Sequence, residues 1–141
     1  MIAPIEDTGF FRGWYPDGEY FLSEGMIYFN VSFIPKYTEI PNYTAPDEGY
    51  RTARSMGRGM TAMPIGAIPV YRMENLTWNL FVDSGFIYLI RLHFYEINYF
   101  GNNQFSIYLE NQLAEENANI SLWAGHGGTH ILVYRDYVVR I

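Results

Sequence analysis

Few residues in this sequence combine in a pattern that could catalyse a reaction. The turn His126–Gly128 has the composition of an oxyanion-hole turn, but the chain has no G-x-S-x-G elbow to supply a serine nucleophile. His126, His130 and Asp136 could ligate a metal, yet a glycine-rich loop does not hold two imidazoles at a fixed separation as a helix does. Glu115 and Glu116 are adjacent on an expected strand end, so their side chains point to opposite sides. The sequence therefore predicts a non-catalytic protein with no metal or cofactor.

Binding chemistry is better represented, first by a basic stretch. Arg51, Arg54, Arg58 and Arg72 lie in residues 49–73, which contain no Asp or Glu, although the whole chain carries a net charge of −6. One interpretation is that these arginines are the solvated ends of strands. The other is that Arg51, Arg54 and Arg58 form a contact surface for a uronate sugar or an acidic peptide.

Aromatic side chains offer a second mode of binding. Trp14, Tyr15 and Trp123 could each stack on a neutral sugar, as lectin-like modules do. The alternative for residues 10–15 is an apolar flap that packs over the rest of the protein. Salt separates the charged mode of binding from stacking, because screening weakens only the charged mode.

Composition limits the class of partner. The chain has 141 residues, the size of one domain with its own core, and it includes 13 tyrosines but a single lysine, Lys36. A net charge of −6 argues against nucleic acid, whose phosphates require a basic surface. The absence of cysteine removes disulfide and thiolate chemistry.

Four glycosylation sequons point to the secretory pathway. They begin at Asn30, Asn42, Asn75 and Asn119, and each has a middle residue other than proline. The first residues, Met1–Glu6, show neither a basic n-region nor an apolar h-region, so we expect no signal peptide in the chain as given. No apolar run is long enough to predict a transmembrane helix.

The stretch from Asn75 to Glu96 is expected to organise the fold. Apolar residues alternate with polar ones over 76–82, with Phe81 as the one exception, and this is the period of a strand. Residues 83–85 can form a tight turn, and an apolar run follows over 86–94. We therefore predict a hairpin whose second strand, 86–94, is buried on both faces in the centre of a sheet.

Other segments are expected to be short strands. Alternation predicts strands over 27–33 and 105–110, while 50–56, 120–123 and 131–141 are read as further strands. Residues 58–74 contain Pro64, Gly66 and Pro69 and follow neither period, so we expect an irregular loop or insertion there. Many short strands without an amphipathic helix predict an all-β antiparallel sandwich that forms one domain over residues 1–141.

Several stretches also carry distinctive motifs in a fixed order. These are Tyr50–Gly57, Asn75–Trp78, Val82–Phe86, Tyr88–Glu96, Phe105–Glu115 and Tyr134–Val139. Together they closely resemble the malectin-like ectodomain of plant receptor-like kinases of the FERONIA type, over most of residues 10–139. The resemblance implies a jelly-roll-like β-sandwich on the extracellular face of the plasma membrane. It also implies partners: pectic cell-wall polymers, or secreted RALF peptides bound together with a small lipid-anchored co-receptor.

The sequence departs from the family pattern in three places. The family usually has a cysteine where this chain has Tyr95. The loop that corresponds to residues 58–74 is usually shorter in the family. Family members also continue past the segment that ends here at Ile141. We therefore expect one membrane-proximal module without the kinase, missing its last strands and left with an unpaired sheet edge. Three functions stay open: a non-catalytic receptor module that senses carbohydrate or peptide, a neutral-sugar lectin-like module, and a non-functional truncated fragment that would unfold without cooperativity.

Overall fold

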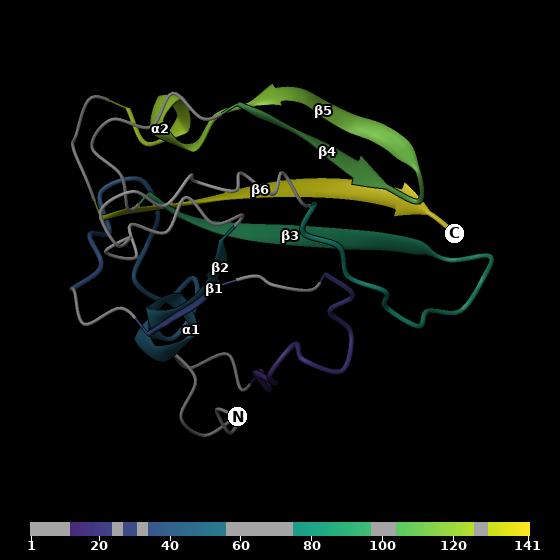
Figure 1. Ribbon diagram of the computed structural model, residues 1–141, viewed down its shortest axis with the longest axis horizontal. Coiled ribbons are helices and arrows are strands. Elements are labelled where there is room, and N and C mark those ends of the chain that lie inside the picture. The colour runs from purple at the N-terminus through teal and green to yellow at the C-terminus, as the bar shows by residue number, and fades with distance from the viewer. Residues whose placement is uncertain (1–11, 24–26, 31–33, 56–74, 97–103, 126–129) are drawn as a thin grey trace, which may run out of the picture.

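The computed structural model describes residues 12–23, 27–30, 34–55, 75–96, 104–125 and 130–141. Within these ranges the chain is mostly strand, with two short helices (Figure 1). The elements are β1 (Ile27–Asn30), α1 (Asp47–Arg51), β2 (Thr52–Ser55), β3 (Ile87–Glu96), β4 (Phe105–Leu109), β5 (Gln112–Ala118), α2 (Ile120–Trp123) and β6 (Ile131–Arg140). The predicted all-β class is confirmed.

Three antiparallel ladders organise the described strands. β1 pairs with β2, β3 pairs with β6 over ten residues, and β4 pairs with β5. The β4–β5 hairpin turns at Glu110 and Asn111, which both have positive φ angles. Figure 1 shows this hairpin lying above the long β3–β6 pair, with α1, β1 and β2 below it. The sandwich is thus built around β3 and β6.

One face of the β3–β6 ladder is covered by the β4–β5 layer and α2. Phe94 of β3 packs against Phe105 and Trp123, with ring centroids 5.9 and 5.2 Å away. The hydroxyl of Tyr137 on β6 donates a hydrogen bond to Glu115 on β5. Beneath these contacts lies a cluster that we call the α2 core, formed by the buried residues Ala124, Ile131 and Val133.

The other face of the ladder is covered at one end only. There the buried residues Ile40, Ala45, Tyr50 and Leu132 form a cluster that we call the α1 core, because Tyr50 belongs to α1. Half-buried aromatic residues, Trp14 and Tyr134 among them, pack around it. The segment before β1 and helix α1 therefore seal this end of the sheet.

The prediction that residues 86–94 are buried on both faces is wrong for their first half. Ile87 and Leu89 are 69% and 66% exposed, because nothing within the described residues covers this part of the face. The predicted hairpin is also wrong. β3 pairs with β6 rather than with 76–82, and Trp78 instead forms an isolated antiparallel bridge with Phe21. The turn before β3 is present, and Gly85 adopts a φ of 86° that favours glycine.

Two predicted strands contain helix. Residues 120–123 form α2, since the Oδ1 atom of Asn119 accepts a hydrogen bond from the N–H of Leu122 and caps the turn. Tyr50 and Arg51 end α1, and the predicted strand begins only at Thr52. β1 confirms the strand expected from residue 27, while residues 31–33 and the predicted irregular loop 58–74 lie outside the described residues.

Candidate functional site

Arg54 was a predicted ligand-binding residue, and the structure places it in an internal network instead. Its Nε and Nη2 atoms donate to the two carboxylate oxygens of Asp17, each at 2.8 Å, and its guanidinium lies 3.9 Å from the ring centroid of Phe21. Trp78 also donates from Nε1 to Asp17, at 2.8 Å. The bond from Arg54 holds the pKa of Asp17 below its ordinary value. Asp17 thus ties Arg54 of β2 and Trp78 to the segment before β1, and this use of the Arg54 side chain argues against a role in binding ligand.

Trp14 is likewise engaged within the fold. Its ring meets the edge of His93 at 5.9 Å, and the guanidinium of Arg12 lies 5.1 Å from the ring centroid. Arg12 also donates to the carbonyl oxygen of Thr44 at 2.8 Å, so this contact is anchored. The expectation of an apolar flap suits Trp14 better than a sugar platform does. Tyr15, in contrast, is 68% exposed.

Trp123 has little free ring surface. The guanidinium of Arg135 lies 4.4 Å from its ring centroid, and the rings of Phe94 and Phe105 pack at 5.2 and 6.2 Å. A sugar stacks on an open aromatic face, whereas a guanidinium already lies over this indole ring and two phenyl rings pack against it. Trp123 therefore acts in packing the α2 core, which argues against it as a sugar platform.

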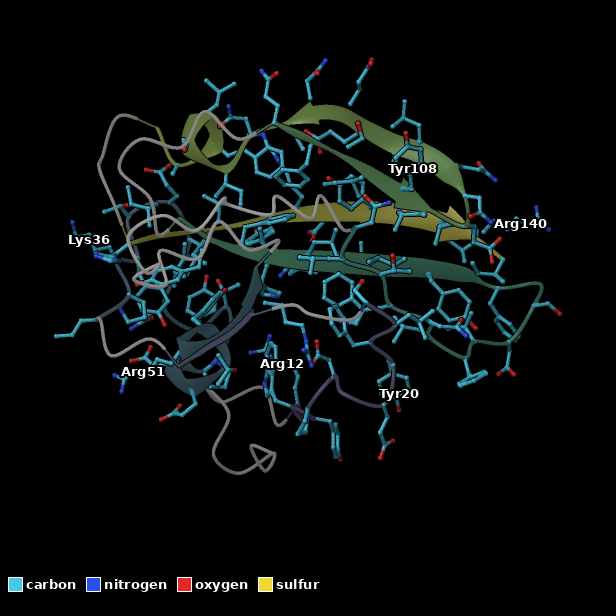
Figure 2. All side chains as sticks on the ribbon, viewed as in Figure 1. Arg12, Tyr20, Lys36, Arg51, Tyr108 and Arg140 are labelled. Atoms are coloured by element: carbon cyan, nitrogen blue, oxygen red, sulfur yellow. The ribbon has the colours of Figure 1, made fainter. Side chains whose placement is uncertain are left out.

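The basic surface expected at 51–58 is reduced to one described residue. Arg51 is exposed at the end of α1, and Figure 2 shows it pointing outward, at the opposite end of the molecule from Arg140. Arg54 is bonded to Asp17 and Arg58 lies outside the described residues. Arg51 and Tyr15 remain as the exposed members of the predicted binding set.

A half-buried histidine lies beside the α1 core. The Nδ1 atom of His93 is 2.7 Å from the hydroxyl of Tyr50, and the two rings meet edge to face at 5.5 Å. Burial, assisted by the positive charges of Arg91 and Arg12, lowers the pKa of His93 to about 4. Sequence reasoning did not select His93, although a histidine that interrupts one face of an apolar strand is a usable signal.

The candidate catalytic and metal-binding residues are not brought together. His130 lies next to Tyr95, with its Nδ1 atom 3.0 Å from the tyrosine hydroxyl, and Asp136 is bonded to Arg91. Glu115 accepts a hydrogen bond from Tyr137. His126 lies outside the described ranges, and within them no three His, Asp or Glu side chains converge as metal ligands would.

The four sequon asparagines differ in accessibility. Asn42 and Asn75 are exposed, whereas Asn119 is 6% exposed and uses its side chain to cap α2. Asn30 is the last residue of β1. A glycan on Asn119 would have to leave through the packed surface around α2, so the structure favours Asn42 and Asn75 as acceptors.

The most distinctive described surface was not predicted from the sequence. Residues directly opposite each other in an antiparallel ladder project from the same face. The register therefore places Ile87, Leu89 and Arg91 of β3 beside Arg140, Val138 and Asp136 of β6. All six are exposed, and we call this surface the open face.

The open face has an apolar centre and a charged rim. Ile87, Leu89 and Val138 are 69%, 66% and 72% exposed. At one end Arg91 donates to the two oxygens of Asp136, at 2.6 and 2.5 Å, and this bond lowers the pKa of the aspartate. Arg140 stands at the other end, near the C-terminus (Figure 2). Contiguous exposed apolar side chains with a polar rim are typical of surfaces that bind another polypeptide.

The sequence is similar to plant receptor-like kinases. No family model matches the chain. Over 147 residues it is 41% identical to the receptor-like protein kinase FERONIA of Arabidopsis thaliana, and over 142 residues it is 35% identical to ANXUR2 of the same plant. These matches cover 99% and 96% of this chain but 15% and 16% of the two kinases. The chain thus spans about a sixth of the length of the curated relatives.

The similar solved structures are ectodomains. The chain matches a complex of the plant peptide RALF23 with FER and LLG2 at a TM-score of 0.77 and 38% identity, and the ANX2 ectodomain from Arabidopsis thaliana at 0.79 and 33%. Both matches cover 99% of this chain and 37% of the solved chain. The region matched is therefore part of the extracellular portion and not the kinase.

Proposed function

Because this chain is homologous to a module of the malectin-like ectodomain of FERONIA-type receptor-like kinases, we propose that it is a non-catalytic extracellular module that recognises a secreted peptide together with a co-receptor. The observation that carries this proposal is the match along 99% of the chain to a solved complex that contains RALF23 and LLG2. In the part of the chain that the structure describes, no helix is long and apolar enough to span a bilayer.

The arrangement of the aromatic residues supports peptide recognition over sugar binding. Trp14 and Trp123, two of the three candidate sugar platforms, are packed against charged and aromatic neighbours within the fold, and only Tyr15 is left exposed. Arg54, which would contact a uronate, is bonded to Asp17. Exposed apolar side chains and Arg51 remain, and they suit a polypeptide partner. The net charge of −6 further favours a basic peptide.

Binding of synthetic RALF23 to the immobilised chain, measured with and without soluble LLG2, tests this proposal. We expect the peptide to bind at least about tenfold more tightly when LLG2 is present, a coupling typical of linked sites. An oligogalacturonide serves as the comparison ligand. Absence of peptide binding under both conditions would overturn the proposal. Oligogalacturonide binding that weakens with salt and with Arg51→Ala would assign the module to charged carbohydrate instead.

Glycosylation provides a test of the extracellular assignment. When the chain is secreted from plant cells behind a heterologous signal peptide, we expect N-glycans on Asn42 and Asn75, which are exposed, and none on Asn119, which is buried. Mass spectrometry of peptides before and after enzymatic deglycosylation measures occupancy at each sequon. The matched variants Asn42→Gln and Asn119→Gln should differ, because only the first removes a glycan. Full occupancy of Asn119 in folded protein would contradict the buried position of this side chain.

A further inference from the structure

The open face defined above is left uncovered on one side of the β3–β6 ladder, at the end where β3 begins and β6 ends. β3 and β6 are the longest described strands, and the opposite face of the same ladder is covered by β4, β5 and α2. At its far end the same face is sealed by the α1 core. Three large apolar side chains, Ile87, Leu89 and Val138, are each more than half exposed on the uncovered part of this face. Burial of such residues would release roughly 1.5–3 kcal/mol per side chain, which favours a covering partner.

The open face is self-complementary in charge. A two-fold axis in the plane of the contact can run across the strands or along them. Across the strands, it sets Arg140 opposite the Asp136 of a second copy and sets Leu89 and Val138 opposite themselves. Along the strands, it sets Arg91 opposite Asp136 and Leu89 opposite Val138. In neither case do like charges of the six residues meet. Leu89 and Val138 meet apolar side chains in both cases, whereas Ile87 meets an arginine.

We propose that the open face binds a second copy of this chain and forms a closed, face-to-face dimer. Leu89 and Val138 supply the apolar contact between the copies, and the charges at the two ends are compatible with either two-fold arrangement, because neither sets like charges opposite each other. Because the same surface is used by both copies, the contact is isologous and stops at two. Packing would bring the two ladders to about 10 Å from each other, the usual distance between stacked sheets.

Sedimentation of the full chain across a wide concentration range tests the proposal. We expect a monomer–dimer equilibrium with no larger species. Leu89→Arg places a charge in the apolar centre and should raise the dissociation constant at least about tenfold. Leu122→Arg is the matched control, since Leu122 is 71% exposed on α2 and outside the open face, and it should leave the equilibrium unchanged. A monomer at every concentration would overturn the proposal and would point to a different polypeptide as the cover.

Crosslinking keeps the test independent of the stability of the arginine variant. The chain has no cysteine, so a single introduced cysteine reports only contacts between copies. With a bismaleimide that spans about 10 Å, the spacing of stacked sheets, Leu89→Cys and Val138→Cys should give crosslinked dimers, alone or mixed. Leu122→Cys should remain monomeric on a denaturing gel. Equal crosslinking of all three variants, or ladders beyond the dimer, would contradict a closed two-fold contact through the open face.

Discussion

Replacement of Leu132 by alanine is expected to lower the free energy of unfolding by about 2–5 kcal/mol, the range for large-to-small changes in well-packed cores. Leu132 has no exposed surface and lies in the α1 core with Ile40, Ala45 and Tyr50. Its neighbours come from the loop before α1, from α1 and from β6, so a cavity there would loosen three segments at once. Urea unfolding at neutral pH, followed by tryptophan fluorescence, measures the loss.

Leu122→Ala is the control for this substitution. Leu122 is 71% exposed on α2, so the same chemical change removes little packing and should alter the free energy by less than about 0.5 kcal/mol. Equal unfolding midpoints for Leu132→Ala and the unsubstituted chain would contradict the position of Leu132 in a core. A non-cooperative transition in the unsubstituted chain would favour the view that the chain is a fragment without function.

Strand positions could be predicted because alternation is local information. β1, β4 and β6 follow runs in which apolar and β-branched residues dictate an extended backbone. Which strands pair with each other was harder to predict. Residues 76–82 alternate as a strand should, but β3 forms its ladder with β6, which is 35 or more residues distant in sequence. Pairing over such distances depends on how all the layers pack, and the sequence pattern of one hairpin does not contain that information.

The short helices were missed for a related reason. α2 consists of four residues, Ile120–Trp123, too few to show a helical period. Its signal lies in its ends: Asn119 caps the first turn, and Gly125 follows the last one with a φ of 67°. Asn119 also begins a sequon, so the sequence allowed two roles for it: glycan acceptor or helix cap. Its burial supports the capping role.

Of the residues predicted to bind ligand, only Arg51 and Tyr15 are exposed in the described part of the structure. Arginine and tryptophan are common in binding sites, but the same side chains are also the ones that cover apolar surface and bond across segments. The sequence could not show that Arg54 faces Asp17, or that Arg135 lies over Trp123, because those partners are 37 and 12 residues apart. The open face could have been found only from the register of β3 and β6.

The half-buried side chain of His93 makes the stability of the fold depend on pH. His93 faces Tyr50 of α1, Trp14 of the segment before β1, and Tyr134 of β6, while Arg91, Arg12 and Asp136 act on it electrostatically. Burial is the largest cause of its low pKa, and the two arginines add to it against the opposing effect of Asp136. The neutral imidazole is therefore the form that the folded protein accommodates.

Acidification below pH 6.5 is expected to destabilise the protein through His93. The pKa of His93 is 6.5 ordinarily and about 4 in the folded chain, so between these values the unfolded chain binds a proton that the folded chain does not. The free energy of unfolding should thus fall from pH 6.5 to 4, by about 2–3 kcal/mol after allowance for partial solvent exposure.

Urea unfolding of His93→Gln and Tyr50→Phe across this pH range identifies the cause of the effect. His93→Gln removes the titrating group, so its stability should fall less steeply with acidification than that of the unsubstituted chain. Tyr50→Phe removes one hydrogen bond, at a cost of about 1 kcal/mol, but leaves the imidazole in the same half-buried position. Because burial dominates the pKa shift, Tyr50→Phe should keep the full pH dependence. Equal slopes for His93→Gln and the unsubstituted chain would show that protonation of another group controls the response to acid.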